Sequence, residues 1–256
     1  RQSSAVSSRV AMRRVMASLS RQPALPRHRM MRAMGSLYLV RHGQASFGAA
    51  DYDQLSPKGH EQCRLLGAYW RERGQRFDAV FTGTLKRHAQ SLAGIVEGLG
   101  EPLVPVALPG LNEYDSEAVV RAIHPGPLAP PRDAEAVKQH FRLLRQGLLA
   151  WMAGEAAPVG MPSHADFAAG VAEALDRVRA VGVGRQVLIV SSGGPIATAV
   201  AQVLQTPPET FVELNLRIRN SAVTEFAFNP KRHHLVTFNT LPHLDTAETR
   251  GHITHA

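Results

Sequence analysis

The 256-residue sequence contains a single cysteine, Cys63, and this scarcity limits what the chain can be. One thiol cannot form an intramolecular disulfide framework or a zinc site built from several cysteines. No apolar run approaches the roughly 18 residues that a membrane-spanning helix needs. Hydrophobic residues still make up 44% of the chain, so a collagen-like, mucin-like or wholly disordered protein is excluded. The length favours one large domain over two small ones.

Acidic residues are absent from residues 1–36, where eight arginines lie. The whole chain has 29 basic and 21 acidic residues, so its net charge of +8 arises entirely in this segment. Residues 37–256 have no net charge, and this argues against a nucleic-acid-binding domain. Because the segment shows no sustained apolar period, residues 1–35 are predicted to be a disordered basic extension. Three origins stay open: translation from upstream of a natural start at Met34, an organellar targeting leader, or a basic binding tail.

Apolar patterning from residue 36 to the end predicts one domain of alternating strands and helices. Strands are expected at 37–40, 78–82, 102–108 and 186–191, with a closing pair at 221–228 and 234–239. Helices are expected at 58–72, from about 84 onward, along the apolar stripe from 137 to 151, at 164–181 and at 196–204. This alternation predicts a three-layer α/β sandwich with a mostly parallel central sheet. The turn-rich segment 109–162 breaks the pattern, and we expect it to be a helical insertion over the strand ends.

Three polar segments follow predicted strands, namely 41–43, 82–87 and 191–195. Ligands of such sheets bind beyond the carboxyl ends of the strands. Arg41 and Arg87 offer planar charged forks that match phosphate oxygens. Gly193 precedes a helix, where free backbone N–H groups favour negative charge. His42 is the titratable nucleophile among them, and a neutral imidazole can attack phosphorus. Each segment alone has an ordinary structural explanation, but together they predict a phosphate site.

The order and spacing of five motifs resemble those of the histidine phosphatases, also called the phosphoglycerate-mutase-like superfamily. The matching stretches are LYLVRHG at 37–43, LSPKGHEQ at 55–62, TGTLKRHAQS at 82–91, LNE at 111–113 and VSSGGPI at 190–196. The resemblance spans about residues 36–244. It implies that His42 accepts the phosphoryl group and that Arg41 and Arg87 bind it. Glu113 would protonate the leaving group and later activate water, with Asp115 a less favoured substitute.

The sequence departs from the family pattern at Ser192, where relatives carry a second pocket histidine that donates a hydrogen bond to the phosphoryl group. A neutral hydroxyl forms a weaker bond than a cationic imidazole, so the exchange predicts a loss of roughly tenfold or more in rate. His233, His234 and His243 are candidates to fold into the pocket instead.

A second departure follows the nucleophile motif. In the stretch 44–48, only Gln44 and Ser46 have side chains suited to contact phosphate. The expected substrate-binding set is therefore Arg41, Arg87, Gln44, Ser192 and Gly193.

The loop between the nucleophile motif and the LSPKG helix is short, whereas mutases of the family carry a longer, Trp-containing loop. The resemblance therefore implies a phosphomonoesterase that needs no cofactor or metal, with the insertion 109–162 shaping specificity. The expected substrate is a phosphorylated small molecule or a phosphoprotein, with no nucleic-acid or membrane partner and a cytoplasmic location. A pseudoenzyme that binds a phosphorylated ligand and a phosphoglycerate mutase remain as alternatives.

Overall fold

The computed structural model describes residues 34–46, 53–126 and 134–255. The predicted basic extension lies outside the described residues except for its last two positions. Of these, Gly35 already belongs to the first strand, β1 (Gly35–Arg41), so the folded part begins earlier than the predicted strand at 37–40. Part of the predicted insertion, 127–133, also lies outside the description.

The described residues form a six-stranded mixed sheet with the order β3-β2-β4-β1-β5-β6. Neighbouring strands from β3 to β1 run parallel, whereas β5 is antiparallel to β1 and β6 is antiparallel to β5. The mostly parallel sheet and the closing pair of strands are therefore confirmed. The further strands are β2 (Ala79–Thr82), β3 (Pro105–Ala107), β4 (Gln186–Ser191), β5 (Val223–Phe228) and β6 (His233–Thr240).

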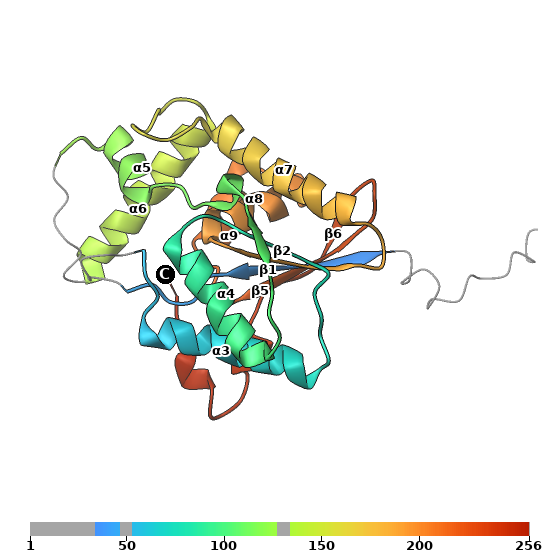
Figure 1. The fold of residues 1–256 in the computed structure, drawn as a ribbon. Coiled ribbons are helices and arrows are strands. Elements are labelled where there is room, and N and C mark those ends of the chain that lie inside the picture. The colour runs from blue at the N-terminus through green and yellow to red at the C-terminus, as the bar shows by residue number, and fades with distance from the viewer. Residues whose placement is uncertain (1–33, 47–52, 127–133, 256) are drawn as a thin grey trace, which may run out of the picture. The chain divides into compact units, whose positions relative to one another are not determined.

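Helices cover both faces of the sheet, as the predicted three layers require (Figure 1). Successive side chains of a strand point to opposite faces, so Leu39 of β1 enters one core and Val40 the other. The core on the side of Val40 is closed by α3 (Pro57–Glu72) and α4 (Lys86–Leu99). Cys63 is fully buried there.

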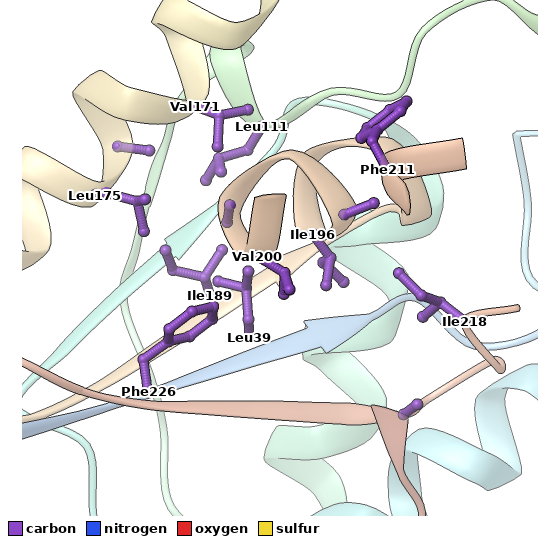
Figure 2. Close-up of a cluster of buried hydrophobic side chains, with 14 of the residues drawn as sticks. Leu39, Leu111, Val171, Leu175, Ile189, Ile196, Val200, Phe211, Ile218 and Phe226 are labelled. Carbon is purple, nitrogen blue, oxygen red and sulfur yellow. The ribbon is translucent and has the colours of Figure 1, made fainter. Parts of the chain in front are cut away.

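The opposite face is covered by α7 (His164–Val181) and α8 (Gly193–Leu204). Figure 2 shows Ile189 and Phe226 of the sheet beneath Ile196 and Val200 of α8. These four side chains are almost fully removed from water. Their burial holds the first turn of α8 at the carboxyl end of β4, where the polar motif 191–195 lies.

The insertion is helical, as predicted, and contains α5 (Ser116–Ile123) and α6 (Ala134–Met152), which pack together. The sequence did not indicate α5 or the later helix α9 (Pro208–Asn215) as separate elements. Asp115 caps α5, because its Oδ1 accepts hydrogen bonds from the backbone N–H groups of Glu117 at 2.9 Å and Ala118 at 3.0 Å. This helix-capping role makes Asp115 unsuited to substitute for Glu113.

Candidate active site

The carboxyl ends of β1, β2 and β4 bring the three predicted segments together. Arg41 pairs with Ser191 in the parallel register of β1 and β4. The backbone N–H of His42 donates to the carbonyl of Ser191 at 2.8 Å. The backbone N–H of Gly83 donates to the carbonyl of Val190 at 3.2 Å. The polar groups that follow each strand therefore leave the sheet side by side.

His42 is held as a neutral imidazole with a defined tautomer. Its Nδ1 lies 2.7 Å from the carbonyl oxygen of Gly43. A carbonyl oxygen can only accept, so Nδ1 carries the proton and Nε2 keeps its lone pair. Burial, followed by the positive charges of Arg41 and Arg87, lowers the pKa of His42 well below 6.5. The ring therefore stays uncharged near neutral pH, and Nε2 is a competent nucleophile.

The two predicted arginines are both buried beside this imidazole, with 7% of Arg41 and 8% of Arg87 exposed. Arg41 donates from Nη1 to the carbonyl of Ile218. Arg87 donates from Nη1 to Oδ1 of Asp53 at 2.8 Å. The other oxygen of Asp53 accepts from the backbone N–H of Lys86 at 2.8 Å, so one carboxylate caps α4 and orients Arg87.

Glu113 lies against the first turn of α8. Its Oε1 accepts from the backbone N–H of Gly194 at 3.0 Å. A Cβ atom at Gly194 would lie only 2.3 Å from that oxygen, so the approach requires glycine. Burial raises the pKa of Glu113 above 4.5, although the charges of Arg41 and Arg87 oppose the rise. A carboxyl group with a raised pKa is suited to donate a proton.

Side chains from separate elements fix the loop that carries Glu113. The hydroxyl of Ser191 donates to the carbonyl of Leu111 at 2.7 Å. Oδ1 of Asn112 accepts from the backbone N–H of Thr84 at 2.7 Å. On the far side of Glu113, the hydroxyl of Tyr114 accepts from Nδ2 of Asn215 at 2.6 Å. The position of the carboxylate is therefore set by β4, by the β2–α4 loop and by α9.

Ser192 is fully buried at the start of α8, and its hydroxyl lies 2.7 Å from Nε2 of His88. His88 follows Arg87 in the first turn of α4, and its ring centroid lies 6.0 Å from that of His42. An imidazole does therefore reach Ser192, but it comes from α4.

The three histidines named as candidates to compensate for Ser192 contact other parts of the domain. Nε2 of His243 lies 2.9 Å from the hydroxyl of Ser221. His233 packs against Phe226 and Phe228, and together with His234 it lines a separate cavity of about 430 Å³. Residue 233 pairs with Phe228, which pairs with Gly35 at the amino end of β1, so this cavity lies away from His42.

The remaining predicted binding residues differ in their surroundings. A Cβ atom at Gly193 would lie 3.6 Å from Oε2 of Glu113, so Gly193 borders the site. Oε1 of Gln44 accepts from the hydroxyl of Ser56 at 2.9 Å, which links the nucleophile loop to the start of α3. A contact between Gln44 and phosphate stays a prediction.

A model of the histidine phosphatase superfamily (branch 1) matches residues 37–241. The chain belongs to this superfamily. The match begins in β1, runs through the insertion and includes every predicted site residue from Arg41 to Gly193.

Solved structures of two phosphatases and a mutase share the fold at low sequence identity. Phosphoserine phosphatase from Entamoeba histolytica, in complex with 3-phosphoglyceric acid, is 19% identical; the match covers 82% of this chain and all of that one, with a TM-score of 0.56. Phosphoglycerate mutase from Bacillus anthracis is 17% identical over 84% and 97% of the two chains, with a TM-score of 0.57. Mycobacterial glucosyl-3-phosphoglycerate phosphatase is 22% identical over 80% and 98%, with a TM-score of 0.56.

Two polar residues of this histidine phosphatase site were not anticipated from its sequence. Asp53 lies in the loop before α3, where no pattern distinguishes it from a solvated acid. His88 could have been noticed, because it directly follows a predicted phosphate-binding arginine at the start of a helix.

In the part of the chain that the structure describes, no helix is long and apolar enough to cross a membrane. The same residues contain no group of three or more His, Cys, Asp or Glu side chains suited to a metal ion.

Proposed function

We propose that this protein is a phosphatase that hydrolyses a phosphomonoester through a phosphohistidine intermediate on His42. Membership of the superfamily and the phosphatase and mutase neighbours support a phosphatase-type or mutase-type enzyme. The observation that carries the more specific proposal is the environment of His42. The bond from Nδ1–H to the Gly43 carbonyl leaves the Nε2 lone pair available, and the ring is close enough to Arg41 and Arg87 for their charges to lower its pKa.

In the first step, Nε2 of His42 attacks phosphorus and the bond from phosphorus to the ester oxygen breaks. The protonated carboxyl group of Glu113 gives its proton to the departing oxygen and becomes a carboxylate. The imidazole becomes positively charged as the N–P bond forms, and the Gly43 carbonyl stabilises this charge through Nδ1–H. Arg41 and Arg87 stabilise the charge on the phosphoryl oxygens, so the proposed chemistry uses no cofactor.

In the second step, water attacks the phosphorus of phosphohistidine. Glu113, now a carboxylate, accepts a proton from that water, the N–P bond breaks, and inorganic phosphate leaves. Because the Glu113 loop is fixed on three sides, the same carboxyl group is in place for both steps. The cycle returns His42 to its neutral form and Glu113 to its acid form.

The proposed substrate is a phosphorylated small molecule or a phosphoprotein, and the proposed location is the cytoplasm. The first experiment is a screen of the full chain against phosphomonoesters, including phosphoserine and sugar phosphates, in the presence of EDTA. We expect release of inorganic phosphate with at least one of them and no release by His42→Ala. A His60→Ala variant, changed on the exposed face of α3, is the matched control and should remain active.

The same screen distinguishes the alternatives. A mutase would convert 3-phosphoglycerate to 2-phosphoglycerate with little release of inorganic phosphate. A pseudoenzyme would bind inorganic phosphate, as measured by calorimetry, but turn over no member of the panel. Inhibition of the wild-type enzyme by EDTA would contradict the metal-free chemistry proposed here.

A further inference from the structure

The contact between His88 and Ser192 joins a neutral imidazole to a buried hydroxyl. His88 is fully buried, and burial followed by the charge of Arg87 lowers its pKa to about 3. The ring is therefore neutral at pH 7 and carries one N–H. Its Nδ1 has no hydrogen-bond partner among the described residues. It lies against Gly83, where a Cβ atom would come within 2.2 Å of it.

Two arrangements of hydrogen atoms are compatible with this contact. If Nδ1 carries the proton, the Ser192 hydroxyl donates to Nε2 and a buried N–H group is left unsatisfied. If Nε2 carries the proton, it donates to Ser192 Oγ, and the Ser192 O–H must donate elsewhere. No residue of the described chain accepts from that hydroxyl. A phosphoryl oxygen in the pocket would accept from it, so an anion favours the second arrangement.

We propose that His88 is the positioning residue for Ser192, whose hydroxyl donates a hydrogen bond to the transferring phosphoryl group. This proposal rests on the proposed function. Elsewhere in the family a second pocket histidine provides the hydrogen-bond donor to the phosphoryl group. Here we assign the donor to Ser192 and its orientation to His88. Ser192 contacts the phosphoryl group from the end of β4, and His88 on α4 holds Ser192 in the donating orientation. The adjacent Arg87 connects the same helical turn to the phosphate.

The location of the pair supports this role. The ring of His88 lies 6.0 Å from that of His42, centroid to centroid, so the residue that bonds Ser192 is close to the nucleophile. Ser192 directly precedes Gly193 and Gly194, whose backbone contacts Glu113. Ser192 is therefore next in the chain to the glycines beside Glu113, and its hydroxyl bonds an imidazole that lies near His42.

The test measures kcat and KM for Ser192→Ala, His88→Leu and the double variant. Each single variant should lower kcat by roughly 10- to 100-fold, the value of one hydrogen bond to a charged group, with little change in KM. The double variant should be no slower than the singles, because the two residues act as one donor. His88→Gln keeps an N–H group near Nε2 and should recover most of the lost rate.

His243→Gln is the matched control, since His243 forms a second buried contact between an imidazole and a serine hydroxyl among the described residues. It should change stability and leave kcat near the wild-type value. Losses that multiply in the double variant would overturn the proposal. Wild-type kcat in Ser192→Ala together with a slow His88→Leu would overturn it as well, because His88 would then act by supporting the fold.

A second measurement does not depend on turnover. In ¹⁵N NMR spectra at pH 7 with inorganic phosphate, His88 should show a protonated Nε2 and an unprotonated Nδ1. Adding phosphate should shift the Nε2–H resonance in the wild type and not in Ser192→Ala. A proton on Nδ1 in the phosphate complex would overturn the proposal. If no phosphomonoester is hydrolysed, the proposed function fails, and this spectrum still decides whether His88 orients Ser192 toward an anion.

Discussion

The carboxylate of Glu113 accepts a hydrogen bond from the backbone N–H of Gly194 at 3.0 Å, inside a buried pocket that also contains Arg41 and Arg87. Burial raises the pKa of this carboxyl group and the two arginines oppose the rise. The surroundings of Glu113 therefore favour its protonated form, while its carboxyl oxygen still accepts the hydrogen bond from Gly194 of α8. This balance leads to a prediction about the pH dependence of the reaction.

In the wild type, kcat/KM should fall on the alkaline side as Glu113 loses its proton, because only the acid form can protonate the leaving oxygen. The raised pKa moves this fall above the pH at which an ordinary glutamate ionises. Glu113→Gln should lower kcat by roughly 10²–10⁴-fold on an alkyl phosphate and remove the alkaline limb. Stopped-flow assays across pH measure both effects.

Asp115→Asn is the control for Glu113→Gln, since it makes the same chemical change two residues away. Asparagine can still cap α5, so this variant should retain activity and its alkaline limb. A Glu113→Gln enzyme with an unchanged pH profile would contradict the role of Glu113 as proton donor.

Asp53 should determine how well Arg87 binds phosphate. Asp53→Asn keeps an oxygen that can cap α4 but removes the negative charge 2.8 Å from the guanidinium. A hydrogen bond to a charged group is worth about 1.5–3 kcal/mol, so we expect kcat/KM to fall by roughly tenfold or more. Inhibition by inorganic phosphate should weaken in parallel. Asp78→Asn, which alters the ion pair with Arg185 at the amino end of β4, should leave both quantities unchanged.

The backbone contact between the nucleophile loop and α3 should tolerate no side chain. A Cβ atom at Gly59 would lie 2.1 Å from the carbonyl oxygen of Gln44, and one at Gly43 would lie 2.2 Å from that of Gly59. Gly59→Ala should lower the free energy of unfolding by about 1–3 kcal/mol, the usual cost of overpacking, and slow turnover by displacing His42. Urea denaturation measures the first effect. Gly251→Ala has open space around it and should behave as the wild type; an equally stable Gly59→Ala would contradict the contact.

Buried neutral histidines should make the domain less stable in acid. The pKa of His243 is lowered from 6.5 to about 3 by burial. Below pH 6.5 the unfolded chain binds a proton that the folded chain does not, so the free energy of unfolding falls as the pH drops toward 3. One such group contributes at most about 1.4 kcal/mol per pH unit. His243→Gln should therefore flatten the dependence between pH 7 and 5 in urea titrations. An unchanged slope would show that His243 is not a source of it.

The strands, in their order along the chain, and the meeting of their carboxyl ends were predicted well, because a short buried strand is a continuous apolar run that is easy to recognise in a sequence. The runs ending at Arg41 and Ser191 placed His42 and Gly193 at one edge of the sheet, and the resemblance to the histidine phosphatases added Glu113. The sequence did not predict α5 or α9, because each has only 8 residues, about two helical turns, which is too short for a repeating apolar pattern to stand out. It also pointed to the wrong histidines beside Ser192. Which imidazole reaches that hydroxyl depends on where the first turn of α4 and the first residue before α8 meet at the edge of the sheet, and local sequence pattern does not show this.

The central claim is that His42 becomes phosphorylated during turnover, and rapid quenching tests it most directly. The enzyme is mixed with a ³²P-labelled phosphomonoester from the active panel, quenched within milliseconds in alkali, digested and mapped. The account predicts a label on the peptide that contains His42, stable in alkali, labile in acid, and lost on a chase with unlabelled substrate. Acid-stable label on Ser192, or turnover without any covalent label, would contradict it.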